Sequence, residues 1–162
     1  MKSADFMETH IRKATVGDIN DILVLNSLLF EEDREYDKTL DMTWTRKRGM
    51  KYFLDRITRR DKCALVAVNG IKIVGYLVGG LCDSASYRLS VVSAELENML
   101  VLEDFRGKGV GKKLVEEFLS WCKTNNVANI SVTASAVNNR GIKFYKSLGF
   151  KDYNLTLEMS TS

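Results

Sequence analysis

The stretch that decides the fold is residues 94–125, which read AELENMLVLEDFRGKGVGKKLVEEFLSWCKTN. Residues 94–102 have the pattern of a strand that becomes fully apolar toward its end. A glycine-rich loop follows, Arg106-Gly107-Lys108-Gly109-Val110-Gly111, and leads into an apolar stripe at helical spacing. Glycines let backbone amides approach a ligand, and a helix start carries unpaired N–H groups. The stretch therefore predicts an anion-binding site.

Positive charge around this loop indicates that the anion is a phosphate. Lys112 and Lys113 follow the glycines and add to Arg106 and Lys108. A P-loop needs Ser or Thr after its lysine, and none follows Lys112. A dinucleotide fingerprint needs G-x-G-x-x-G, whereas this loop has G-x-G-x-G. Neither of those motifs fits, and a plain glycine turn before a solvated basic helix remains the alternative without a function.

Strand and helix patterns alternate along the rest of the chain, which predicts an α/β or α+β domain. The expected strands are 9–14, 63–69, 71–80, 94–102, 129–134 and 150–159, and the expected helices are 16–30, 44–60, the later part of 107–125, and 139–148. Asn69-Gly70 between two apolar runs is typical of a tight hairpin. Thr15 and Asp18 have the spacing of a capping box. We expect one domain over 9–162, with 1–8 as a disordered start.

Composition sets limits on the function. The net charge of +3 is too mild to indicate a nucleic-acid or membrane partner. Three widely spaced cysteines and one histidine disfavour a disulfide framework, a zinc site or any other metal centre, and a reducing cytoplasm fits them better. No apolar run approaches the ~20 residues that a membrane span needs, and the first residues lack the apolar region of a signal peptide.

A second motif lies about 30 residues after the glycine loop. Asn138 is followed by Phe144-Tyr145-Lys146-Ser147-Leu148-Gly149-Phe150. With R-x-x-G-x-G after an apolar strand, this pattern resembles the GNAT superfamily of N-acetyltransferases. Leu96 to Val101 is similar to the fourth strand of that family, and Ile11 to Ala14 is similar to its opening. The resemblance runs from about residue 9 to 159.

The resemblance implies a fold and a cofactor. The fold is a mixed, mostly antiparallel sheet flanked by helices, with splayed fourth and fifth strands that hold the pantetheine arm of acetyl-CoA between them. The residues that it implies for coenzyme A are Met99, Leu100, Val101, Arg106, Gly107, Lys108, Gly109, Val110, Gly111, Lys112, Asn138 and Tyr145. The implied reaction moves an acetyl group from acetyl-CoA directly to an amine in a ternary complex, and homodimers are common in the family.

The chemistry needs a proton acceptor, because an alkyl amine with a pKa of ~10.4 is almost fully protonated at pH 7. Glu97 is the first candidate, directly or through a water, and Glu95 on the same face of the strand is the alternate. Tyr145 resembles the family's general acid for the leaving thiolate, and a backbone N–H near Met99 suits the oxyanion. The alternatives are ordinary polar positions for the two glutamates and a core aromatic for Tyr145.

The acceptor is expected near the acidic segment 31–41. Carboxylates at Glu31, Glu32 and Asp33, with Tyr36 beside them, would attract a cationic amine such as a polyamine, an aminoglycoside, a lysine side chain or a protein N-terminus. A solvated acidic loop is the simpler interpretation. Two other functional classes stay open: a catalytically silent acyl-CoA sensor and a nucleotide-binding domain unrelated to acetyl transfer.

Overall fold

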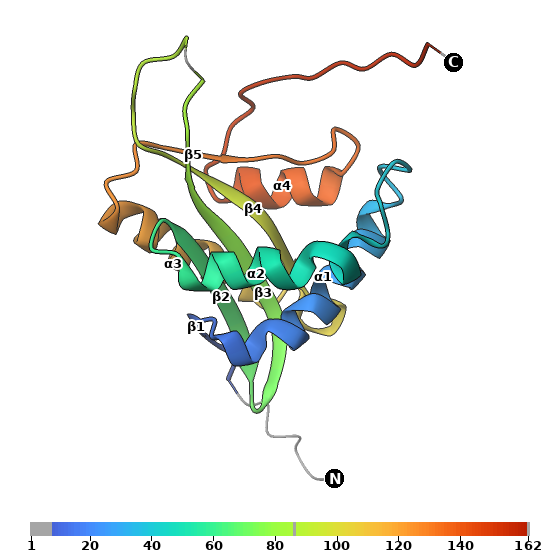
Figure 1. Ribbon diagram of the computed structural model, residues 1–162, viewed down its shortest axis with the longest axis vertical. Helices are drawn as coiled ribbons and strands as arrows, with labels where there is room; N and C mark the ends of the chain where they lie inside the picture. The colour runs from blue at the N-terminus through green and yellow to red at the C-terminus, as the bar shows by residue number, and fades with distance from the viewer. Residues whose placement is uncertain (1–7, 86, 162) are drawn as a thin grey trace.

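A five-stranded sheet runs through the middle of the molecule in the order β1-β2-β3-β4-β5 (Figure 1). The structure, a computed structural model, describes residues 8–85 and 87–161. The strands are β1 His10–Lys13, β2 Lys62–Asn69, β3 Lys72–Cys82, β4 Ser93–Val101 and β5 Asn129–Val132. The first four pair antiparallel, and β4 pairs parallel with β5. The expected mixed, mostly antiparallel sheet is confirmed.

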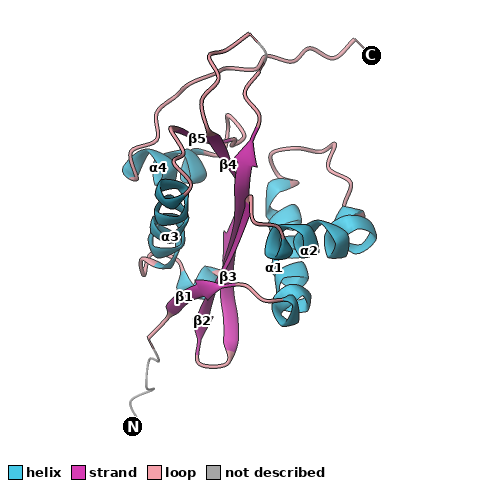
Figure 2. Cartoon of the chain, turned by 60° about the vertical axis from the view of Figure 1, so that its left-hand side comes forward, coloured by secondary structure: helices cyan, strands magenta, loops and turns pink. Residues whose placement is uncertain are grey.

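Helices cover both faces of the sheet (Figure 2). On one face lie α1 Ile19–Asp33 and α2 Met50–Thr58, and on the other lie α3 Val110–Thr124 and α4 Asn139–Ser147. A 3₁₀ turn at Val16–Asp18 precedes α1, a π-helical turn at Thr45–Gly49 leads into α2, and a 3₁₀ turn at Glu103–Phe105 follows β4. The helix expected over 44–60 therefore forms as two pieces.

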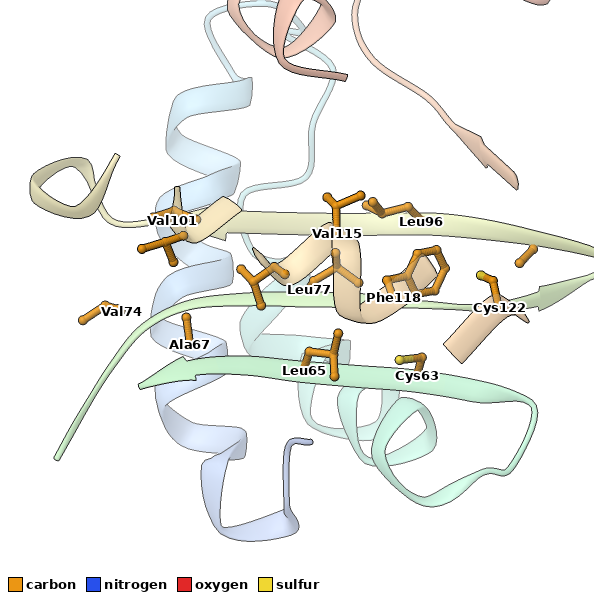
Figure 3. Close-up of a cluster of buried hydrophobic side chains, with 13 residues drawn as sticks. Cys63, Leu65, Ala67, Val74, Leu77, Leu96, Val101, Val115, Phe118 and Cys122 are labelled. Atoms are coloured by element: carbon orange, nitrogen blue, oxygen red, sulfur yellow. The ribbon is translucent and has the colours of Figure 1, made fainter. Parts of the chain in front are cut away.

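Two hydrophobic cores fill the space between the layers. One lies under α3 and centres on Leu77, Leu114 and Phe118 (Figure 3). Burial there raises the pKa of Cys63 to about 12 and that of Cys122 to about 11, so both thiols stay protonated near neutral pH. The other core lies under α1 and α2. It includes the fully buried Ile22, Phe53 and Tyr76.

An irregularity in β4 breaks the alternation of its side chains. Asn98 lies opposite Val78 and Leu96 lies opposite Gly79, so Glu97 is an extra residue in the strand. Leu96 packs in the core under α3, whereas the Asn98 side chain bonds to Tyr52 and Tyr76 on the α1–α2 side. A Cβ at Gly79 would lie 2.5 Å from the backbone oxygen of Glu95, which explains the glycine opposite the bulge. The bulge thus directs two consecutive polar residues to one face.

Beyond this bulge, β4 and β5 part. Their pairing begins at Ser93 and Asn129 and ends at Leu96 and Val132, although β4 continues to Val101. The expected splaying of the fourth and fifth strands is therefore confirmed. It leaves the β5-facing edge of β4 without a strand partner from Glu97 onward among the described residues.

Two expectations about the ends of the chain have different outcomes. The strand expected over 150–159 is wrong, because the segment has no strand assignment. Its residues alternate between apolar and polar as in a strand, but it belongs to no sheet of the described residues. We expected a disordered start over 1–8, and residues 1–7 lie outside the described residues. None of the described helices has the length and apolar character needed to cross a bilayer.

The first turn before α1 depends on one carboxylate, and this predicts an acid-sensitive stability. Asp18 accepts from Arg12 Nη1 at 2.7 Å and from the Thr15 backbone N–H at 2.7 Å, as the capping pattern predicts. These bonds, that from Arg12 first, lower the Asp18 pKa from 3.8 to about 2. Because the folded pKa is the lower one, the stabilisation is complete above the unfolded pKa and is lost as pH falls through about 2.

Asp18→Asn is therefore expected to lower the free energy of unfolding by about 1–2 kcal/mol at pH 7. The loss is no larger because the Arg12 side chain is exposed to water, which weakens its ion pair with Asp18. The difference from the wild-type protein should shrink toward pH 2. Urea unfolding at both pH values measures it. An equal loss at pH 7 and pH 2 would show that the charge of Asp18 is not what stabilises this turn.

Candidate active site

A cavity of about 1000 Å³ opens where β4 and β5 separate. Five regions line it: the end of α1 with the loop after it, the second half of β4, the glycine loop with the start of α3, the β5–α4 connection with α4, and Glu158 in the segment after α4. The sequence-predicted residues that line it are Glu32, Asp33, Tyr36, Glu97, Met99, Leu100, Val101, Arg106, Gly107, Gly109, Gly111, Lys112, Asn138 and Tyr145. The structure therefore brings most of the predicted site together.

Four predicted residues do not line this cavity. Glu31 is exposed on α1, and Glu95 lies in β4 before the bulge. Val110 is buried at the start of α3. The Lys108 ammonium lies 5.6 Å from the centre of the Phe105 ring. Lys108 and Val110 instead border a separate smaller pocket near Thr9 and Asn69.

The glycine loop forms one end of the cavity. Gly107 and Gly109 have φ values of 70° and 81°, in the left-handed region that favours glycine. A Cβ built on either would meet no heavy atom within 4 Å, so the backbone is open on that side. Gly109 is also the N-cap of α3, which places the positive end of the helix here. This end of the cavity suits a phosphate group.

Glu32 links α1 to this loop. Its Oε1 lies 2.5 Å from Arg106 Nη2, and its Oε2 lies 2.9 Å from Arg140 Nη2. Arg106 also donates through Nε to the backbone oxygen of Val101 at 2.7 Å. The charge of Glu32 is therefore balanced by two arginines, and this carboxylate is poorly placed to attract a cationic acceptor.

Glu97 sits in the middle of the cavity wall and is held from the α2 side. Tyr52 OH donates to Oε2, and Arg56 Nε donates to the same oxygen at 2.8 Å. Lys62 Nζ lies 3.6 Å from Oε1. The Glu97 side chain is 15% exposed, so these interactions are well shielded from water. Oε2 is occupied, and Oε1 remains available to a ligand or a water.

A chain of hydrogen bonds runs behind Glu97 through the core. Asn26 Nδ2 donates to Tyr76 OH at 3.0 Å, and Tyr76 OH donates to Asn98 Oδ1 at 2.7 Å. Asn98 Nδ2 in turn donates to Tyr52 OH at 3.0 Å. Burial first, and then Glu97, raises the pKa of Tyr52 above its ordinary value, so Tyr52 remains a donor. Every bond points toward the carboxylate, which fixes its position.

Asp33 and Tyr145 also line the cavity. Burial, and next to it the charge of Glu32, raises the pKa of Asp33. Burial, and next to it Asp33, raises the pKa of Tyr145 to about 12. The phenol is therefore protonated near neutral pH and has a proton to donate. No side chain in the described part of the molecule hydrogen-bonds to the Asp33 carboxylate.

Asn138 has a structural role beside its place in the cavity. Its Oδ1 accepts from the backbone N–H of Gly141 at 2.9 Å and so caps α4. The cap fixes the start of the helix that carries Tyr145. Tyr145 is held in turn between Phe144 and Phe150, with ring centroids 5.2 and 5.7 Å away. The second sequence motif therefore builds the wall that presents the tyrosine.

The sequence analysis missed four residues that shape this site: Tyr52, Arg56, Asn98 and Arg140. Tyr52 and Arg56 are four apart on α2 and share the face that meets Glu97. The adjacent polar pair Glu97-Asn98 in an otherwise alternating strand was a usable signal for a bulge. Nothing local indicated that α2 would lie over it.

Comparison with known proteins identifies the family. Residues 26–150 match the acetyltransferase (GNAT) family. The chain belongs to this family. That membership confirms the resemblance drawn from the two motifs.

Two archaeal relatives are similar over most of the chain. An uncharacterized N-acetyltransferase of Methanocaldococcus jannaschii is 28% identical over 144 residues, which is 88% of this chain and 60% of that protein. One of Archaeoglobus fulgidus is 29% identical over 140 residues, or 85% of this chain and 89% of that protein. This chain thus spans less than two thirds of the first relative.

A solved structure shares the fold. The aminoglycoside N-acetyltransferase AAC(6')-Iy, in complex with CoA, superposes with a TM-score of 0.71 over 94% of this chain and 99% of that one. Its sequence identity is 16%, so the likeness concerns the fold.

Proposed function

We propose that this chain transfers the acetyl group of acetyl-CoA directly to a cationic primary amine. The observation that carries the proposal is that one cavity joins three features. Its lining includes the open glycine loop with its basic residues, the anchored carboxylate of Glu97 with the phenol of Tyr145, and further carboxylates from α1 and the loop after it. This combination matches a ligand with phosphates at one end and an acceptor with positive charge at the other.

The residues present fit coenzyme A. The open backbone of Gly107 and Gly109 leaves room for a pyrophosphate, with Arg106 and Lys112 beside it. The edge of β4 from Met99 to Val101 lacks a strand partner among the described residues, which leaves backbone groups for an extended amide-bearing arm. Acetyl-CoA would supply the thioester carbonyl near Glu97 and Tyr145.

The residues of this chain would handle the protons and the charge. Glu97 Oε1 takes a proton from the acceptor ammonium, through a water, while Tyr52 and Arg56 hold Oε2. The free amine attacks the carbonyl carbon, and a backbone N–H of β4 near Met99 stabilises the negative charge on the carbonyl oxygen. The C–N bond forms and the C–S bond breaks. Tyr145 gives its proton to the leaving thiolate, and the Tyr145 phenolate takes the extra proton from the nitrogen as the amide forms.

The acceptor would be drawn by the carboxylates that remain unbalanced. Glu32 is paired with two arginines, but Asp33 and Asp37 also line the cavity, and Glu158 lies at it as well. Three carboxylates around one entrance attract an amine with more than one positive charge, such as a polyamine. This supports a cationic acceptor over a neutral or anionic one.

Calorimetric titration with acetyl-CoA, with ATP and NAD as controls, tests the cofactor. Thiol release with a panel of amines then tests the transfer. Micromolar binding of acetyl-CoA alone, followed by thiol release with a cationic amine, is the expected result. Binding without thiol release for any amine would instead identify an acyl-CoA sensor, and tight binding of ATP or NAD without acetyl-CoA would overturn the proposal.

The double variant Asp33→Asn and Asp37→Asn is expected to raise KM for spermidine about tenfold, because it removes two charges from the acceptor side. The Kd for acetyl-CoA should stay within twofold. Since the pKa of Asp33 is raised, protonation of Asp33 should also raise the wild-type KM as pH falls toward that pKa. Glu31→Gln, an exposed carboxylate outside the cavity, is the control. An equal effect of the control would point to long-range charge instead of contact.

A further inference from the structure

A lysine side chain reaches the carboxylate of Glu97 from across the sheet. Lys62 is the first residue of β2, and its Nζ lies 3.6 Å from Oε1 of Glu97 in β4. Because β3 lies between these two strands, the lysine side chain has to cross a whole strand. Only 14% of that side chain is exposed. The ammonium of Lys62 is therefore largely shielded from water, beside the oxygen that Tyr52 and Arg56 leave available.

The sequence makes room for this crossing at Gly80. Lys62 and Gly80 are partners in the pairing of β2 with β3. A Cβ at Gly80 would lie 2.3 Å from Cδ of Lys62, so the aliphatic part of the lysine lies directly over the glycine. The backbone of Gly80 does not have a positive φ, so space accounts for the glycine here and backbone conformation does not. The gap in β3 thus directs the ammonium toward Glu97.

The ammonium is held loosely at this position. It donates to the backbone oxygen of Leu81 at 3.2 Å, which is the long end of the usual range, and 3.6 Å to Oε1 is too long for a hydrogen bond. These are its polar contacts among the described residues. A lysine has a flexible four-carbon chain. A small rotation therefore brings Nζ to Oε1, on the residue that lines the cavity.

We propose that Lys62 is an acetylation site, to which this chain transfers the acetyl group of acetyl-CoA within one molecule. The inference rests on the proposed function, because it uses the same cofactor and the same base. That reaction needs a primary ammonium beside Oε1 of Glu97, and Lys62 supplies one. An amine that belongs to the chain itself needs no binding step, which favours its reaction over that of an amine in solution.

The protons and electrons of this transfer balance without a further reagent. Glu97 Oε1 takes one proton from the Lys62 ammonium, and the lone pair of the nitrogen attacks the carbonyl carbon of the thioester. The C–N bond forms and the C–S bond breaks, with its electron pair left on sulfur. Tyr145 gives its proton to the thiolate and takes the second proton from the nitrogen. The products are acetylated Lys62, the free thiol of coenzyme A and one proton on Glu97 that passes to water.

Incubation of the full chain with acetyl-CoA and no added amine, followed by peptide mass mapping, tests the site. We expect Lys62 to gain an acetyl group about tenfold faster than Lys72, an exposed lysine at the start of β3. Acetic anhydride needs no enzyme and should give the reverse order, because Lys62 is shielded from water. The fraction of Lys62 modified at a given time should not depend on protein concentration, since the transfer occurs within one molecule.

Glu97→Gln shows whether the base takes part. In this variant we expect the rate at Lys62 with acetyl-CoA to fall to that at Lys72, while both rates with the anhydride stay unchanged. The inference is overturned if Lys62 is no faster than Lys72, if Glu97→Gln leaves its rate unchanged, or if the rate rises with protein concentration.

Thiol release with spermidine separates this inference from the proposed function. Release by a protein whose Lys62 stays unmodified would overturn the inference and leave the proposed function standing. Acetylation of Lys62 without thiol release for any added amine would support the inference and contradict transfer to an external acceptor.

Discussion

Glu97→Gln is expected to lower kcat about 100-fold while leaving the Kd for acetyl-CoA within twofold. The amide has nearly the same shape and can still accept from Tyr52 and Arg56, so the wall of the cavity is kept. It cannot take a proton from an ammonium ion. The loss should therefore appear in turnover and not in cofactor affinity, measured by thiol release at saturating acetyl-CoA and by calorimetry.

Glu95→Gln is the matched control. Glu95 belongs to the same strand two residues earlier, but it lies before the bulge and does not line the cavity. We expect its kcat to stay within twofold of the wild-type value. A large loss for Glu95→Gln with none for Glu97→Gln would move the base to Glu95. No loss for either variant would mean that solvent takes the proton.

The difference between these two glutamates shows what the sequence could not predict. By alternation alone Glu95 and Glu97 share a face, which made Glu95 the alternate to Glu97. The bulge separates them, because the pairing of β4 with β5 ends at Leu96 and only Glu97 reaches the opening between the strands. A bulge depends on how two strands fit together, here on the close approach at Gly79. The local sequence gives only a weak signal for such a bulge.

Elements with a strong local signal were predicted well. The helix at Val110–Thr124 and the glycine loop before it follow from an apolar stripe and a run of glycines, both of which are local properties. The contacts of Tyr52 and Arg56 with Glu97 are not local, since they join residues more than 40 positions apart. The residues of the site could therefore be predicted where they belong to a continuous sequence motif, but the residues that α2 contributes could not.

The segment over 150–159 shows that a clear local pattern can still lead to a wrong prediction. Its alternation predicted a strand, and this prediction was wrong. A strand needs a neighbouring strand to complete its hydrogen bonds, and the alternation of one segment does not show whether such a neighbour is present.

Gly109→Ala is expected to raise the Kd for acetyl-CoA by 10- to 100-fold, or about 1.4–2.8 kcal/mol. Gly109 has φ +81°, lines the cavity and has open space where a Cβ would point. A methyl group there would occupy the position proposed for a phosphate and would also disfavour the backbone that presents the amides. Calorimetric titration of both proteins measures the change.

A second glycine of the same chain, Gly149, provides a control for the effect of backbone strain alone. Gly149 has φ +97° and open space around its Cβ position, but it follows α4 and does not line the cavity. Gly109→Ala and Gly149→Ala should lower the free energy of unfolding by similar amounts, about 1–2 kcal/mol, because both force alanine into the left-handed region. Only the first should weaken binding. If both variants bound acetyl-CoA as the wild-type protein does, the glycine loop would not hold the phosphates, and the proposed orientation of the ligand in the cavity would be wrong.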